Sequence, residues 1–429
     1  MTVSATMSAG QTAPQKRWLR IIPPVMIVYI FAFMDRVNFG FAMAGGMNEA
    51  LKITASTAGL AAGVFFIGYL VFQIPGGHIA ERGWAKTFVA LSILCWGGLS
   101  VLTGLVTEAW QLMALRFLLG AAEGGVWPAI LVIIAKWFPA EERARANALF
   151  IMNINIAILL TNPLSGWIIQ NYGWRNVFVI EGVVSVMLIL LWWPLIDERP
   201  RDAKWISPEE RDHIVSRIAL EEKAVHQSGV TSYRALFVDA SFWKLTAFYF
   251  FFQVGDIGFM MWLPTILKNL VQQNMTRVGL LSALPFLAAM AGLYVIAALS
   301  DRTAKRRLYL AIPAIAFAVA LIASVQTRDL AIVAYIFLMT CGLFHNAYNG
   351  VFWGLPPRLF ATEVCGGARG FINGVGNLGG FVGPFLVGWV VTTFGDTRWG
   401  LYALAGFLLL AFVTALSLPS KRIDGKFVL

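Results

Sequence analysis

Long apolar runs dominate the pattern of residues along the chain, and polar or charged residues separate them at regular intervals. A helix that crosses a bilayer core of roughly 30 Å needs about 20 apolar residues, and the runs have this length. The pattern therefore predicts twelve transmembrane helices, at residues 21–43, 57–80, 86–107, 109–136, 146–170, 174–196, 242–268, 277–300, 307–326, 330–357, 366–394 and 398–418.

One long polar stretch, residues 197–241, interrupts the series between the sixth and seventh runs. Within it, Ser207 is suited to cap a helix N-terminus, with Pro208 at the first helical position and Glu210 at the third, so a short surface helix is expected. The resulting organisation is a tail, a six-helix half, a linker, a second six-helix half and a second tail, at residues 1–20, 21–196, 197–241, 242–418 and 419–429.

The two halves repeat each other at an offset of about 221 residues. Three polar residues of the first half, Asp35, Glu81 and Arg82, recur in the second half as Asp256, Asp301 and Arg302. Two parallel six-helix repeats joined by a linker are typical of transporters that bind substrate at mid-membrane between the halves. The fold class expected is an all-α membrane protein.

Composition agrees, since 58% of the residues are hydrophobic and only 13% are charged. These values exclude soluble enzymes, nucleic-acid-binding modules and secreted disulfide scaffolds. Most of the 33 Lys and Arg lie in the tails, the linker and the loops of one side. By the positive-inside rule that side is cytoplasmic, so both termini should face the cytoplasm from an inner or plasma membrane. The few basic residues of the other side are Lys52, Arg175, Lys268, Arg277, Arg328 and Arg398.

No cofactor, metal or nucleic-acid partner is expected. Residues 374–379 match the dinucleotide fingerprint, but no strand precedes them, and their glycines suit close helix packing. The ATP-binding loop pattern is missing from the sequence, and its cysteines and histidines have no metal-site spacing. These residues are Cys95, Cys341, Cys365, His78, His213, His226 and His345.

A series of motifs resembles the major facilitator superfamily, and within it the anion:cation symporters. The series comprises MDRVNFGFA, GGHIAERGWAK, RFLLGAAEGGVWPA, KWFPAEERARANALF, PLSGWIIQNYGWRNVFVIEG, LSDRTAKRR and INGVGNLGGFVGPFLVGW. The resemblance implies import of a small carboxylate, such as a sugar acid, tartrate or an aromatic acid, with protons or another cation such as sodium, by alternating access. It also implies a cytoplasmic gate of charge pairs at Glu81, Arg82, Asp301 and Arg302.

Charged residues inside the predicted spans are the main candidates for chemistry, because each costs roughly 2.5–3.5 kcal/mol at mid-bilayer on insertion scales. Arg36 and Arg116 are expected to bind a carboxylate, since guanidinium groups match its two oxygens. Asp35 and Glu123 are expected to carry protons. The alternative is a salt-bridge network that only joins the first and fourth helices.

In the second half, Asp256 and His345 lie at mid-span, and Asn346 and Asn349 follow the histidine. His345 could take a proton or hydrogen-bond to substrate; the alternative is a neutral histidine bonded to a neighbouring helix. Two polar pairs spaced four residues apart complete the predicted substrate site, although such side chains also serve to join helices. These pairs are Tyr69 with Gln73 and Asn373 with Asn377.

The sequence therefore predicts a monomeric secondary transporter that imports an organic anion with protons. A facilitator, or an antiporter that exports a drug-like compound, would use the same fold. Outside transport, the alternatives are an integral-membrane enzyme and a non-transporting receptor, and the sequence carries no recognised catalytic constellation to favour the enzyme.

Overall fold

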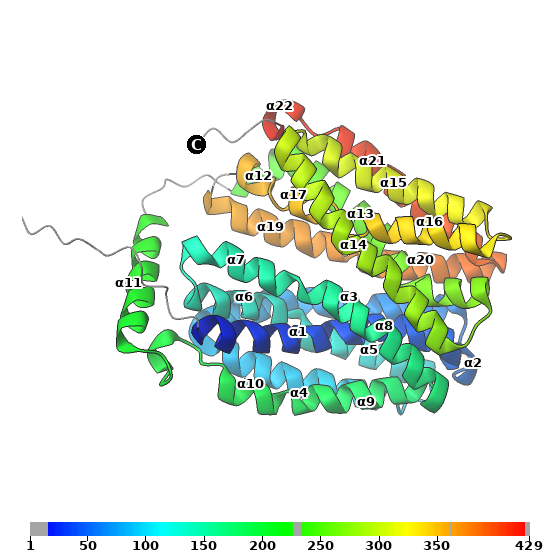
Figure 1. Ribbon diagram of the computed structural model, residues 1–429, viewed down its shortest axis with the longest axis horizontal. Coiled ribbons are helices and arrows are strands. Elements are labelled where there is room, and N and C mark those ends of the chain that lie inside the picture. Colours follow the sequence, from blue (N-terminus) through cyan, green and yellow to red (C-terminus); the bar gives the residue numbers. More distant parts are fainter. Residues whose placement is uncertain (1–15, 226–232, 361, 425–429) are drawn as a thin grey trace, which may run out of the picture.

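The computed structural model describes residues 16–225, 233–360 and 362–424, which are almost entirely helical and contain no β-strand (Figure 1). In the first half, the spans are formed by α1 (Lys16–Ala42), α3 (Ala55–Ile79), α4 (Ala85–Thr103), α5 (Ala109–Gly124) with α6 (Val126–Trp137), α7 (Ala140–Ile151) with α8 (Asn153–Tyr172), and α9 (Trp174–Met187) with α10 (Ile189–Leu195). Two π-helical segments, η1 (Met43–Met47) and η2 (Ala80–Trp84), and the short α2 (Asn48–Ala50) lie in the connections.

The second half follows the same plan. Its spans are α13 (Ala240–Val271), α14 (Met275–Thr303), α15 (Arg306–Gln326), α16 (Ala331–Phe344) with α17 (Asn349–Phe352) and α18 (Pro356–Leu359), α19 (Thr362–Asn377) with α20 (Gly379–Phe394), and α21 (Thr397–Leu416). The linker contains η3 (Pro200–Asp202), α11 (Pro208–Val225) and α12 (Tyr233–Val238), and α22 (Ser420–Ile423) follows the last span.

Eleven helical segments of the described chain are long and apolar enough to cross a membrane. The segment Ala55–Thr103 has 49 residues, more than twice the length that one crossing needs. Gly83 interrupts it with a φ of +95°, a conformation open to glycine, and the chain reverses there. This segment therefore holds two spans, α3 and α4, and the predicted twelve-helix fold is confirmed.

The linker helix α11 stands across the end of the bundle where α1 begins (Figure 1). Its predicted N-cap is confirmed, because the backbone N–H of Glu210 donates to Ser207 Oγ at 3.2 Å. The Glu210 side chain lies 3.6 Å from Arg17 Nε of α1, and the Trp205 ring stacks on Trp137 of α6. The linker is thus packed onto the first half.

The two halves meet at the end of the bundle opposite α11, which we call the far end. Hydrogen bonds join them there between η1 and α13, between the start of α3 and the end of α20, and between α8 and α14. The pairs are Lys268 Nζ with Ala44 O at 2.6 Å, Ser56 N with Thr392 Oγ1 at 2.9 Å, Asn162 Nδ2 with Ser282 O at 2.8 Å, and Met275 N with Gln170 Oε1 at 2.9 Å.

Glycine makes this approach possible. A Cβ on Gly166 of α8 would lie 2.4 Å from the backbone oxygen of Met275, and one on Gly388 of α20 would lie 2.3 Å from that of Ala55. Backbone atoms cannot move aside as a flexible side chain can. The close contact between the two halves at the far end, which we call the seam, therefore requires glycine at these two positions.

Replacing Gly83 should weaken the reversal between α3 and α4. Gly83→Ala places a Cβ in the left-handed region, which costs about 1–2 kcal/mol, and we expect a lower Tm for the purified protein. Intrinsic tryptophan fluorescence in detergent measures it. Gly98→Ala is the matched control because no heavy atom lies within 4 Å of its added Cβ. Equal Tm values for the two variants would contradict the role given to Gly83.

Replacing Gly166 should separate the far ends of the halves. We expect Gly166→Ala to speed alkylation of a single cysteine placed at Ser282, which is fully buried in the seam. A maleimide reacts with this cysteine in a background where Cys95, Cys341 and Cys365 are serine. Gly406→Ala, with nothing within 4 Å of its added Cβ, is the control. Equal alkylation rates would show that the seam tolerates a methyl group.

Candidate functional site

Two helices of the first half bring an ion pair into the protein interior. Arg36 of α1 donates from Nε to Glu123 Oε2 of α5 at 3.0 Å, and both side chains are buried. The Arg36 guanidinium also lies over the ring of Tyr69 from α3, 4.5 Å from the centroid. Within the described chain, Arg36 Nη2 and Glu123 Oε1 have no hydrogen-bond partner. The pair thus keeps one donor and one acceptor available.

Arg116, one of the two predicted carboxylate-binding arginines, does not join this ion pair. Its Nη1 donates to the backbone oxygen of Asp35 at 3.1 Å, and its guanidinium lies against the rings of Phe39 and Phe65 at 4.4 and 4.8 Å. Its Nε and Nη2 have no partner among the described residues. Arg116 therefore presents two further donors within the same buried region.

Asp35 belongs to a second polar cluster that contains a residue the sequence analysis missed. Its Oδ1 accepts from Ser100 Oγ at 2.7 Å and from Asn38 Nδ2 at 3.2 Å. The same Asn38 nitrogen donates to Glu181 Oε2 at 2.7 Å, and Ser165 Oγ donates to Glu181 Oε1 at 3.1 Å. Glu181 could have been found from the sequence, because it is an acid in the interior of the apolar run 174–196.

Breaks in two helices lie beside the candidate residues. Glu123 is one residue from the end of α5, and α6 begins after Gly125. In the second half, α16 ends at Phe344, His345 has an extended ψ of 124°, and Asn346 has a left-handed φ of +57°. The tenth span is therefore unwound at the predicted histidine. Broken helices with free backbone groups are typical of binding sites in transporters.

The structure joins four predicted residues of the second half into one hydrogen-bonded chain. His345 Nδ1 lies 2.6 Å from Asp256 Oδ1, and Asn346 Nδ2 lies 2.8 Å from His345 Nε2. Asn349 Nδ2 then donates to Asn346 Oδ1 at 2.8 Å. In the tautomer in which Nε2 accepts from the Asn346 amide, Nδ1–H donates to Asp256 Oδ1. Both nitrogens of His345 are thus engaged, and the chain ends at Asn349 Oδ1, which has no partner among the described residues.

The remaining predicted polar residues are less closely connected. Asn373 Oδ1 accepts from Tyr249 OH at 3.4 Å, whereas half-buried Asn377 ends α19 next to the break before α20. Gln73 is half-buried, and its Oε1 has no partner in the described chain. Gly374 approaches Leu70 of α3, so these positions lie along the contact between the halves.

The predicted gate residues Glu81, Arg82, Asp301 and Arg302 are exposed. Among the described residues, no hydrogen bond or ion pair joins the first pair to the second.

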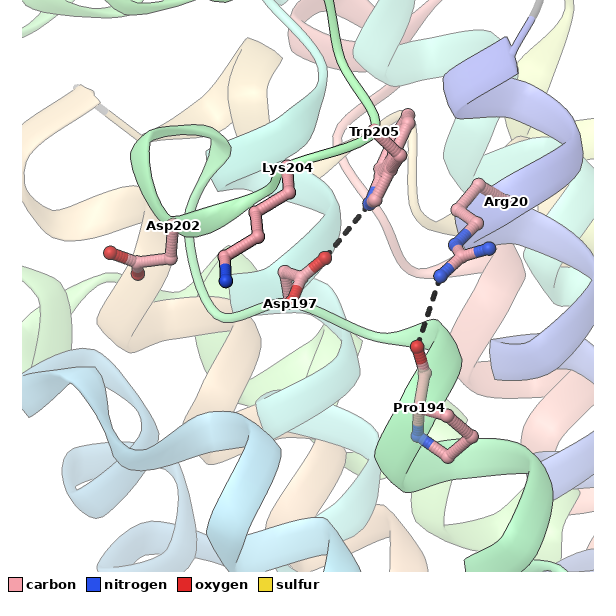
Figure 2. A pocket seen from close by; sticks show the side chains of 6 residues that line it. All are labelled: Arg20, Pro194, Asp197, Asp202, Lys204 and Trp205. Carbon is pink, nitrogen blue, oxygen red and sulfur yellow. Dashed lines mark hydrogen bonds between the residues drawn. The ribbon is translucent and has the colours of Figure 1, made fainter.

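A surface pocket of about 380 Å³ lies near the linker (Figure 2). Two hydrogen bonds join residues that line it, since Trp205 Nε1 donates to Asp197 Oδ2 at 2.8 Å and Arg20 Nη2 donates to Pro194 O at 3.0 Å. It lies apart from the buried charges. Across residues 16–225, 233–360 and 362–424, no group of His, Cys, Asp and Glu is arranged to hold a metal ion.

Comparison with known proteins identifies the family of the chain. The family model described as Major Facilitator Superfamily matches residues 25–384. The chain is 32% identical over 414 residues to the metabolite transport protein NicT of Pseudomonas putida, and 33% identical over 411 residues to a protein named as a tartrate transporter of Agrobacterium vitis. Each alignment covers 94% of both chains.

Among solved structures, a bacterial homologue of the human lysosomal transporter Spinster aligns with a TM-score of 0.78. The alignment covers 97% of this chain and 100% of that chain at 18% identity, which supports the fold alone. The family and the relatives are transporters, so the protein is a multi-pass membrane transporter and not an enzyme. The chain belongs to the Major Facilitator Superfamily.

Proposed function

We propose that the protein imports a small organic anion in symport with protons, by alternating access, through an inner or plasma membrane with both chain ends in the cytoplasm. The observation that carries this proposal is the buried Arg36–Glu123 pair, which keeps Arg36 Nη2 and Glu123 Oε1 without partners in the described chain. A carboxylate oxygen of a substrate would complete the hydrogen bonding of Arg36.

The charges of the site favour an anion. Arg36 and Arg116 are both buried, and Arg116 has two donor nitrogens without partners among the described residues. Two guanidiniums would repel a cationic compound, whereas a carboxylate offsets their charge. The relative named as a tartrate transporter is consistent with this substrate class.

Glu123 would couple the anion to a proton. Arg36 can donate to Glu123 and to a substrate carboxylate at the same time, but the two anions then repel each other and compete for its single positive charge. A proton on Glu123 removes one competitor, and the bound anion and the bound proton then stabilise each other. Such mutual stabilisation is a coupling free energy between two sites, as symport requires.

The second half would recognise the rest of the substrate. Its hydrogen-bonded chain ends at the acceptor Asn349 Oδ1, and Gln73 of the first half adds the acceptor Oε1. Acceptors without partners suit donor groups such as hydroxyls. Hydroxy acids, including sugar acids and tartrate, are therefore the substrates we favour.

The conformation fits the cytoplasm-facing stage of such a cycle. The halves are hydrogen-bonded to each other at the far end, which is the outer end under the proposed topology. The exposed side chains of Glu81, Arg82, Asp301 and Arg302 are available to form the opposite gate when the halves rock.

Removing the charge of Glu123 should uncouple transport. In proteoliposomes with an imposed inward proton gradient, we expect the wild type to accumulate one or more of a panel of carboxylates together with protons. Glu123→Gln should keep anion exchange but lose gradient-driven accumulation, because the amide cannot take up a proton. The measurement follows labelled carboxylate and internal pH together.

Glu49→Gln is the matched control, since Glu49 is an exposed acid of the short α2. It should accumulate substrate as the wild type does. If no carboxylate moves, or if uptake ignores both the gradient and the Glu123 substitution, the symporter proposal fails and a facilitator or a receptor takes its place.

Arg36→Lys should weaken substrate binding while keeping the charge. A lysine cannot hold Glu123 and a substrate carboxylate with one planar group, and loss of a charge-assisted hydrogen bond of about 1.5–3 kcal/mol raises the exchange KM about ten- to a hundredfold. Arg277→Lys, at an exposed position of α14, should leave KM unchanged. Equal KM values in both variants would show that Arg36 does not bind the substrate.

A further inference from the structure

A second group of buried carboxyls lies behind the Arg36–Glu123 pair. Asp35 and Glu181 are 1% and 2% exposed, and both accept hydrogen bonds from the same nitrogen, Nδ2 of the fully buried Asn38. Because each oxygen is within hydrogen-bonding distance of that nitrogen, the two carboxyls lie within about 6 Å of each other. Two carboxyls this close interact strongly in an environment of low dielectric.

The balance of charge in this part of the first half requires a proton. Glu123 is paired with Arg36, which leaves Asp35 and Glu181 with Arg116 as the one nearby cation of the described residues. Arg116 contacts the backbone oxygen of Asp35 and neither carboxyl directly. Two ionised carboxylates would carry an uncompensated negative charge, whereas one proton makes the group neutral.

Either carboxyl can hold the charge. Asp35 accepts from Ser100 and Asn38, and Glu181 accepts from Ser165 and Asn38, so each has a hydroxyl donor of its own and a share of one amide. The elements packed against α9 near Glu181 are α1, α4, α8, α10 and η1. Among their described residues, Asp35 of α1 is the titratable group that faces Glu181. Arg36 of α1 and, on α5, Arg116 and Glu123 lie beyond it.

We propose that Asp35 and Glu181 share a single proton across Asn38, and that Glu181 thereby sets the charge of Asp35. Glu181 is a positioning residue for the proton, because it acts through Asp35. Asn38 Nδ2 donates to both carboxyls and does not pass a proton between them. The group therefore binds one proton on either carboxyl: as one carboxyl releases its proton to water, the other takes one up from water, so the total charge is unchanged. Its part in transport rests on the proposed function.

Infrared difference titration of the full-length protein in lipid tests the proposal without any substrate. Protonated carboxyls give a carbonyl band that disappears on ionisation, and Asp35→Asn and Glu181→Gln assign the two bands. We expect Glu181→Gln to move the midpoint of the Asp35 band to lower pH by about one to three pH units, because a neighbouring negative charge is removed. Asp35→Asn should move the Glu181 band in the same direction.

Two serine variants provide a matched pair with opposite expected signs. Ser100→Ala removes a donor from ionised Asp35 and should move the Asp35 midpoint to higher pH. Ser165→Ala removes a donor from ionised Glu181, keeps the proton there and should move the Asp35 midpoint to lower pH. Ser185→Ala on α9 is the control, since Ser185 Oγ has no partner among the described residues.

An Asp35 midpoint that is the same in wild type and Glu181→Gln overturns the proposal, as does a shift of the same sign in both serine variants. A purely structural Glu181 would change expression or Tm without these opposite shifts. Gradient-driven uptake by Glu181→Gln then tests the role in transport. Because the titration needs no substrate, it decides the shared proton even if no carboxylate is transported.

Discussion

The cost of holding charge away from water governs the interior of this protein. Arg36, Arg116, Asp35, Glu123 and Glu181 are all buried, and each is kept in place by a charge of opposite sign, a hydroxyl, an amide or a backbone oxygen. Breaking such a pair by removing one partner leaves an uncompensated charge, which costs several kcal/mol. A bound proton or anion also lowers the free energy of an uncompensated buried charge. The same charged groups therefore make the interior respond to ligands.

The second half meets the constraint with fewer formal charges. Asp256 lies within hydrogen-bonding distance of His345, and two amides continue the hydrogen bonding from there. The unwound backbone around Asn346 allows these side chains to converge from one short segment. The first half thus concentrates arginines and carboxyls, and the second half concentrates amides and a histidine that can discriminate between substrates.

The sequence alone predicts the number of spans and the polar linker, because apolar length and capping residues act locally. The Ser207 cap and the twelve helices are of this kind. Contacts between side chains of different helices, in contrast, depend on residues far apart in the sequence. Asp256 and His345 are each recognisable as buried polar residues, but their contact depends on how α13 and the tenth span pack. Glu181 is visible in the sequence as an acid inside an apolar run, but its link to Asp35 through Asn38 depends on how α1 and α9 pack.

The reversal at Gly83 has a mechanical consequence. The five-residue segment η2 joins α3 directly to α4, so a displacement of one helix constrains the other at this connection. The first helix packs along α20 of the opposite half, and the second packs along α9, which carries Glu181. A movement of α20 relative to the first half that displaces α3 can therefore reach α9 through α4. The contact between the halves and the helix that carries Glu181 are linked in this way.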